Sequence, residues 1–322
     1  MSSRNTVSIY GCGGTGINIV SLLMKKNLAG LAEVKAHFVD TSRSNFSAIG
    51  GSNFRDEDCY IIPGATDGSG KERSTNYHPI ARAIPDVLVS HPAGDLNILV
   101  FSGGGGSGSV IGPKLAEELL RQKKPTVFFV VGSAENSQTT KNTMDTWQTL
   151  NGIAKKNEST AVVFYEDNGS VAQDNDVDAQ MVLGLLSILD LYSGEHDRLD
   201  SSDVHRFFNV KNGPGVALLD ITPDYSHAKS LPYPLAVASL HGSVDGANPS
   251  LPSEYGCEGY RRVAEKNDLH FIIYTQDLAG VIAGLQKTVD NFEALARARK
   301  QRESVDVLDT AGLNDDGFKF SS

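Results

Sequence analysis

A run of glycines between an apolar stretch and a helical pattern is the part of this sequence best suited to bind a ligand. Residues 98–101 are apolar, residues 103–106 are four consecutive glycines, and residues 114–121 have the pattern of an amphipathic helix. Glycine allows a ligand to approach the main chain closely, and N–H groups at a helix N-terminus attract anions. The pattern predicts a strand, a loop and a helix that bind a di- or triphosphate. A flexible linker is the alternative, but linkers are not embedded between an apolar run and a helix.

Two further glycine-rich segments also follow short apolar runs. The first, 11–16, has the spacing GxGxxG, which alone is a weak indicator of nucleotide binding. The second, 64–71, is not a Walker P-loop, because its glycine spacing is one residue too long and Glu72 replaces the Ser or Thr that would bind magnesium. Loops after the strands of a parallel sheet open onto one edge of that sheet. The three loops therefore predict a nucleotide that is enclosed from several sides.

The order of apolar and helical segments predicts an α/β fold with a doubly wound parallel sheet. Residues 171–192 are expected to form a long core helix that is apolar on all faces in its middle, and therefore buried all round. At 1.5 Å per residue this helix would span ~33 Å and link the nucleotide edge to the far side of the domain.

The C-terminal part is predicted to form a smaller α+β unit. Its strands are expected at 215–221, 235–240 and 270–274, and a helix at 255–266. The predicted domains are a nucleotide-binding domain at 1–170, the core helix at 171–193, an α+β domain at 194–276 that begins with an acidic loop at 195–203, a helix at 277–304, and an acidic and aromatic tail at 305–322.

Two carboxylates in the acidic loop, Asp200 and Asp203, are three residues apart and would share one face of a first helical turn. One explanation of this pair is structural. Asp200 could cap the N-terminus of the helix, and the Asp203 carboxylate would interact favourably with the positive end of the helix dipole. A catalytic role is the alternative, and the local sequence favours the capping explanation.

Composition limits the classes of function. The net charge of −10 argues against general nucleic-acid binding. The three cysteines are too few and too scattered for a disulfide framework or a zinc site, and they are typical of reduced thiols in a cytoplasm. The eight histidines show no metal spacing. No apolar stretch of about eighteen residues and no signal peptide is present, so we expect a cytoplasmic protein without direct membrane contact.

Three motifs in this order resemble those of the tubulin/FtsZ superfamily. Residues 11–18 match GxGGxGxN, residues 104–109 match GGGTGSG with serine for threonine, and residues 198–203 match NxDxxD with arginine for asparagine. Val110 replaces the last glycine of the second motif, and residues 175–177 with Gly184 match the core helix of the family. The short chain and its acidic tail are most similar to the phage-encoded tubulins of the PhuZ/TubZ type.

The resemblance implies a self-assembling cytoskeletal GTPase that forms dynamic filaments and positions phage DNA within an infected bacterium. Asp200 and Asp203 would then lie at the pole opposite the bound GTP and orient the attacking water at the nucleotide of the next subunit. The resemblance also implies GTP or GDP as ligand, Mg²⁺ held through the phosphates without a dedicated protein ligand, and copies of the same chain as partners. Phage DNA or a capsid would be the cargo, and the host cytoplasm the location.

The resemblance assigns the first glycine loop (residues 11–18) and the signature loop (residues 104–109), with the Ser107 and Ser109 hydroxyls, to the phosphates. It assigns residues 68–71 to the γ-phosphate. Glu135 would contact the ribose, and Asn18, Asn168 and Asp176 would read the guanine edge. Asp40 follows a strand at a position suited to a ribose contact. The full nucleotide set comprises Gly11, Cys12, Gly13, Gly14, Thr15, Gly16, Asn18, Asp40, Thr66, Gly68, Ser69, Gly70, Lys71, Gly103, Gly104, Gly105, Gly106, Ser107, Gly108, Glu135, Asn168 and Asp176. Asp315, Asp316 and Phe318 of the tail would grip the adjacent subunit.

Two other classes of function remain open. An NAD-dependent Rossmann oxidoreductase would explain residues 11–16 and Asp40, but not the run at 103–106 or the acidic pair. A nucleotide-binding scaffold without hydrolysis would explain the loops alone. In each case we expect Cys12 to be a small filler of the phosphate loop and not a nucleophile.

Overall fold

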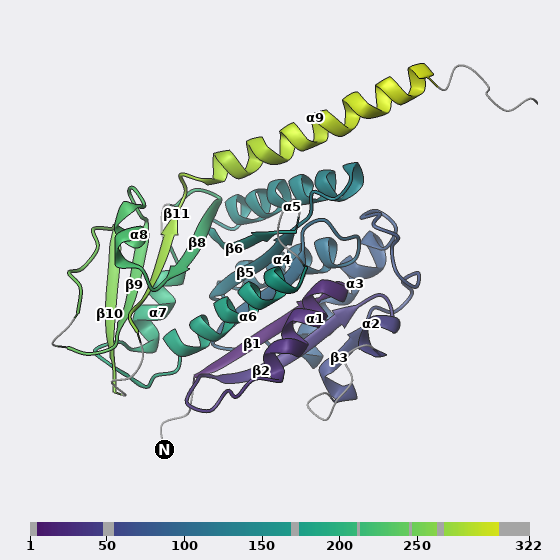
Figure 1. The fold of residues 1–322 in the computed structure, drawn as a ribbon. Coiled ribbons are helices and arrows are strands. Elements are labelled where there is room, and N and C mark those ends of the chain that lie inside the picture. Colours follow the sequence, from purple (N-terminus) through teal and green to yellow (C-terminus); the bar gives the residue numbers. More distant parts are fainter. Residues whose placement is uncertain are drawn as a thin grey trace, which may run out of the picture.

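The computed structural model describes residues 5–47, 55–168, 174–210, 213–244, 247–262 and 267–302. One sheet runs through this part of the chain in the order β3-β2-β1-β4-β5-β6-β8-β11-β9-β10-β7 (Figure 1). The pairs from β3 to β8 are parallel, β11 is antiparallel to both β8 and β9, β10 is parallel to β9, and β7 is antiparallel to β10. The predicted α/β fold is confirmed, and its C-terminal strands extend the same sheet.

Most strands of the sheet coincide with apolar runs of the sequence, but the short β7 and the glycine-containing β10 do not. Their bounds are β1 Thr6–Cys12, β2 Glu33–Asp40, β3 Cys59–Ile61, β4 Leu96–Ser102, β5 Thr126–Gly132, β6 Ala161–Asp167, β7 His196–Asp197, β8 Val216–Thr222, β9 Ala236–His241, β10 Tyr255–Arg261 and β11 Leu269–Tyr274. The central strands β4 and β5 are buried almost throughout, as expected for parallel strands that helices cover on both faces.

The helices form a layer on each face of the sheet. Their bounds are α1 Gly13–Met24, α2 Ser44–Ser47, η1 (a 3-10 turn) Asp56–Asp58, α3 Tyr77–Ser90, α4 Gly108–Arg121, α5 Ser137–Lys156, α6 Asp174–Leu191, α7 Ser201–Phe208, α8 Tyr225–Ser230 and α9 Leu278–Arg302. The apolar residues of α1 and α6 share one core cluster, and those of α3, α4 and α5 share the other. Helix α9 lies along α5 and extends past its end (Figure 1).

The helix predicted at 255–266 is wrong, because this segment begins with strand β10. Residues Tyr255 to Tyr260 pair in parallel with Ala236 to His241 of β9. Charged residues within 254–265 resemble a helical surface, but the segment also carries Gly256, Cys257 and Gly259. Gly259 lies so close to Leu199 that a Cβ there would be 2.9 Å from the leucine side chain. Tertiary packing at a sheet edge therefore overrides the local pattern.

The core helix is confirmed as α6, but it is not buried all round. Leu183 is 56% exposed, whereas Met181, Leu185 and Ile188 are fully buried. Its 18 residues correspond to a length of about 27 Å at 1.5 Å per residue. The helix therefore carries the chain across most of the width of the domain (Figure 1).

No helix among the described residues combines the length and the apolar character that a membrane span requires.

We expect Gly184→Ala to destabilise the fold. A Cβ at Gly184 would lie 2.9 Å from the ring of Phe129 and 3.1 Å from that of Phe164. These two rings stack 4.9 Å apart in the core and cannot move aside easily. Overpacking of this kind costs about 1–3 kcal/mol. The matched control is Gly152→Ala on α5, where no atom lies within 4 Å and the helix should gain about 0.5–1 kcal/mol. The denaturant midpoint measures both, and equal stabilisation by the two substitutions would contradict the packing argument.

Candidate functional site

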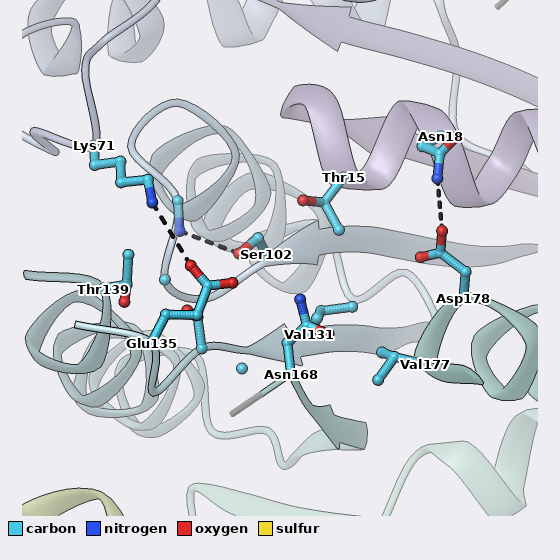
Figure 2. Close-up of a pocket in the computed structure, with 14 residues that line it drawn as sticks. Thr15, Asn18, Lys71, Ser102, Val131, Glu135, Thr139, Asn168, Val177 and Asp178 are labelled. Carbon is cyan, nitrogen blue, oxygen red and sulfur yellow. Dashed lines mark hydrogen bonds and ion pairs between the residues drawn. The ribbon is translucent and has the colours of Figure 1, made fainter. Parts of the chain in front are cut away.

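A cavity of about 300 Å³ opens at the carboxyl ends of the central parallel strands (Figure 2). Ser102 ends β4, Val131 and Gly132 end β5, and Asn168 follows β6. This is the edge at which doubly wound sheets bind their ligands. The cavity is lined by Thr15, Asn18, Lys71, Ser102, Gly104, Gly105, Val131, Gly132, Ser133, Glu135, Thr139, Asn168, Val177 and Asp178.

Two glycine loops meet beside this cavity through their backbones. A Cβ on Gly13 would lie 2.7 Å from the backbone nitrogen of Gly108, and Gly13 has φ +69°, which other residues rarely adopt. Helix α1 begins at Gly13 and α4 begins at Gly108. The two helix N-termini, each with unpaired N–H groups and a positive dipole end, therefore meet here and favour an anion such as a phosphate chain.

A third loop, residues 63–76, covers the signature loop. The Asn142 side chain of α5 donates hydrogen bonds to the carbonyl oxygens of Lys71 (2.8 Å) and Gly104 (3.1 Å). The hydroxyls of Ser69 and Ser107 are 3.0 Å apart. Asn76 donates to the carbonyl oxygen of Gly68 at 3.1 Å. Asn142, which the sequence analysis did not identify, thus links the covering loop to the signature loop, and the predicted residues Ser69 and Ser107 make a second link.

Lys71 and Glu135 face one another at one end of the cavity (Figure 2). The Lys71 Nζ lies 3.8 Å from the Glu135 Oε2, and both side chains are about half exposed. Lys71 has φ +66°, an unusual backbone conformation for a residue with a side chain. An exposed pair of this kind contributes about 0–1 kcal/mol, so a phosphate oxygen can replace the carboxylate as the partner of Lys71.

The opposite end of the cavity carries amide and carboxylate groups (Figure 2). Asn18 of α1 donates a 2.7 Å hydrogen bond to the Asp178 carboxylate of α6. The Asn168 Oδ1 is buried and has no hydrogen-bond partner among the described residues. A buried acceptor without a partner is costly. These groups fit a base with donors on its edge, as guanine has at N1 and at its 2-amino group.

The structure divides the predicted nucleotide residues into those that line the cavity and those that do not. Lining residues are Thr15, Asn18, Lys71, Gly104, Gly105, Glu135 and Asn168. The other predicted positions, Gly11, Cys12, Gly13, Gly14, Gly16, Asp40, Thr66, Gly68, Ser69, Gly70, Gly103, Gly106, Ser107, Gly108 and Asp176, do not line it.

Asp176 is exposed, and the residue that lines the cavity is Asp178. Successive residues of an α-helix are rotated by about 100°, so two residues separated by two positions point about 200° apart. Only one of the two carboxylates can therefore face the cavity. The sequence analysis missed Asp178, although the buried positions Val177 and Met181 indicate which side of the helix faces the protein.

Three other predicted positions are buried and have local roles. The Ser109 hydroxyl donates to the carbonyl oxygens of Gly105 (2.6 Å) and Gly106 (3.1 Å), so it shapes the loop and does not face the cavity. The Asp40 carboxylate is 1% exposed and accepts the Thr41 N–H, and burial raises its pKa. Burial also raises the pKa of the Cys12 thiol far above its usual range, which is consistent with a filler and not a nucleophile.

The acidic pair forms a capping box at the start of α7. The Asp203 N–H donates to the Asp200 carboxylate at 3.0 Å, and the Asp200 N–H donates to the Asp203 carboxylate at 3.4 Å. The predicted capping interaction is confirmed. Because α7 follows the C-terminal end of α6 while Asp178 lies near its N-terminal end, the acidic pair is remote from the cavity of its own chain.

Among the described residues no group of three or more His, Cys, Asp or Glu side chains could hold a metal ion. Asp315, Asp316 and Phe318 lie outside the described residues, and the tail contact stays a prediction.

Known proteins share this fold. No family model matches the sequence. The chain is 29% identical to a phage tubulin-like protein of Pseudomonas phage PhiPA3, over 98% of this chain and 99% of that protein. A solved protofilament of TubZ from bacteriophage PhiKZ has a TM-score of 0.83 at 25% identity, and the phage tubulin PhuZ with GDP has a TM-score of 0.83 at 24% identity. Each likeness covers 98% of this chain and 99% of the solved one.

These comparisons confirm the predicted fold and the resemblance to the phage branch. The protein has the tubulin/FtsZ fold and is similar, over nearly its whole length, to the phage tubulin-like proteins.

Proposed function

We propose that the protein is a GTPase that assembles with copies of itself into filaments. The cavity binds GTP with its phosphates against the N-termini of α1 and α4 and its base against Asn18, Asn168 and Asp178. The solved relatives include a protofilament and a structure with GDP, which supports both the assembly and the nucleotide.

One observation carries this proposal. The cavity lies at the N-terminal end of α6, and the exposed carboxylate of Asp200 lies beyond its C-terminal end, about 27 Å of helix away. Within one chain the two sites cannot act on the same bond. A second copy stacked head to tail would bring its acidic pair to the nucleotide of the first. Such a heterologous contact does not close, and it produces a filament.

The acidic pair would orient and polarise the water that attacks the γ-phosphate, and GTP would be converted to GDP and phosphate at the subunit interface. Lys71 and the N–H groups of the glycine loops would hold the phosphates. Mg²⁺ would be bound through the phosphates and would neutralise part of their charge. GTP thus supports the interface, and its hydrolysis weakens the interface.

A Rossmann oxidoreductase is less consistent with this geometry. The Asp40 carboxylate that would contact a ribose is buried and bonded to its own neighbours. A scaffold without hydrolysis gives the acidic pair no role beyond the helix cap of α7. The positioning of phage DNA in the cytoplasm of an infected bacterium is the cellular role that we propose, because the relatives are phage proteins.

The concentration dependence of GTP hydrolysis tests the composite site. We expect a threshold and a steeper than linear rise in rate, because two chains build one active site. Phosphate release measured over a range of protein concentrations, together with light scattering, gives the answer. A rate strictly proportional to concentration would show that each chain hydrolyses GTP alone.

We expect Asp203→Ala to retain GTP binding, to lower turnover about 100-fold or more and to yield long-lived filaments. The matched control is Asp224→Ala, because Asp224 also accepts a backbone N–H at a helix start, from Ser226 of α8. Loss of a helix-end carboxylate alone should leave turnover within about twofold. Normal hydrolysis by Asp203→Ala would remove this residue from the mechanism.

The base specificity distinguishes Asp178 from Asp176. We expect Asp178→Asn to weaken GTP binding about 30-fold or more, because the amide cannot accept both guanine donors, and to improve binding of xanthosine triphosphate. Asp176→Asn should change GTP affinity less than about twofold, because this side chain is exposed and outside the cavity. Competition with a labelled GTP analogue measures both variants. The reverse pattern would assign the base contact to Asp176.

A further inference from the structure

A tyrosine from a distant strand reaches the acidic pair. Tyr255 is the first residue of β10, and its hydroxyl lies 3.2 Å from the Oδ1 of Asp203 and 3.3 Å from the carbonyl oxygen of the same residue. Since neither oxygen can donate, the hydroxyl is the donor in both contacts. The contact joins residues 52 positions apart in the chain, so it depends on the tertiary fold and not on the helix cap.

This contact distinguishes the two carboxylates. Asp203 uses both oxygens inside the chain, one with the Asp200 N–H and one with the Tyr255 hydroxyl. Asp200 uses only Oδ1, as the acceptor of the Asp203 N–H. Its Oδ2 accepts no hydrogen bond from the described residues, and its side chain is exposed. The pair therefore presents one free carboxylate oxygen, held on a carboxylate that is itself fixed in place.

The position of Tyr255 is itself fixed from two sides. Its backbone is paired with Ala236 of β9, and the Arg206 guanidinium of α7 lies 4.5 Å above its ring. A cation above an aromatic ring attracts it by about 0.5–1 kcal/mol at exposed sites. Burial raises the pKa of the Tyr255 phenol, and the nearby Asp203 charge raises it further. The hydroxyl thus remains a donor throughout the neutral pH range.

We propose that Tyr255 is a positioning residue for GTP hydrolysis. It holds the Asp203 carboxylate at the start of α7 through its hydroxyl, and thereby leaves the second oxygen of Asp200 to accept a hydrogen bond from the attacking water. This inference rests on the proposed function, since it requires that the acidic pair acts on the nucleotide of a neighbouring subunit. It adds to the mechanism a residue from the C-terminal strands, Tyr255, which lies outside the acidic loop motif.

The chain offers a matched control in Tyr260. This residue lies on the same strand, and the Arg198 guanidinium is 5.2 Å above its ring. It therefore has the same kind of cation–π contact with the segment around the acidic pair. Its hydroxyl makes no hydrogen bond to Asp200 or Asp203. Tyr→Phe at the two positions removes the same atom and retains the ring, but only one substitution removes a donor to the carboxylate.

The test compares the full chain with Tyr255→Phe and Tyr260→Phe. We expect Tyr255→Phe to lower kcat for GTP hydrolysis about tenfold. This is part of the roughly 10²–10⁴-fold rate acceleration that a positioned acid or base contributes. GTP affinity and the protein concentration needed for assembly should change less than about twofold. Tyr260→Phe should match the wild type in all three quantities. A general loss of structure would instead alter affinity and assembly together with kcat.

A double-mutant cycle with Asp203→Ala tests whether Tyr255 acts through the carboxylate. We expect Tyr255→Phe to have no further effect on kcat once Asp203 is alanine. Equal kcat values for wild type and Tyr255→Phe, or a tenfold loss that persists without the Asp203 carboxylate, would overturn the inference. If the wild type showed a rate proportional to concentration, the composite site itself would fail. An assembling wild type with a normal Tyr255→Phe would refute only the role of the tyrosine.

Discussion

The contact between two glycine loops, backbone against backbone, is the constraint on which the site depends. Gly13 and Gly108 approach so closely that a single methyl group on either would meet the main chain of the other loop at 2.7 Å. This approach places the N-termini of α1 and α4 side by side at one edge of the sheet. The proposed phosphate site beside the cavity is therefore made mainly of backbone dipoles, whose orientation is fixed by the fold.

The second constraint is the length of α6. The same helix contributes Asp178 to the cavity near its beginning and delivers the chain to the acidic pair after its end. A rigid element that is about 27 Å long keeps the two halves of the proposed active site apart within one molecule. It also fixes the spacing at which a second molecule can complete the site. In the proposed mechanism hydrolysis therefore requires assembly, because the active site is complete only between two subunits.

The features that were predictable from the sequence are those set by local chemistry. Glycine spacing and apolar runs defined the strands, the loops and the core helix because backbone freedom and burial depend on neighbours in the chain. The features that were missed depend on tertiary contacts. The rotation of α6 places Asp178 and not Asp176 along the cavity, and the pairing of β10 with β9 turns an expected helix into a strand. Asn142 holds the covering loop from a helix 71 residues away, which no local pattern indicates.

Capping and catalysis, which compete as explanations of the acidic pair in the sequence, are compatible in the structure. A carboxylate that caps a helix has one oxygen committed to a backbone N–H and loses much of its rotamer freedom. The second oxygen of Asp200 then points in a direction set by α7, and the strand that carries Tyr255 fixes Asp203 in turn. A carboxylate held in this way has already lost its rotamer freedom. Less entropy is therefore lost when it orients a water molecule. In the proposed mechanism the capping box is thus the physical reason why one oxygen of Asp200 has a defined position when a neighbouring subunit approaches.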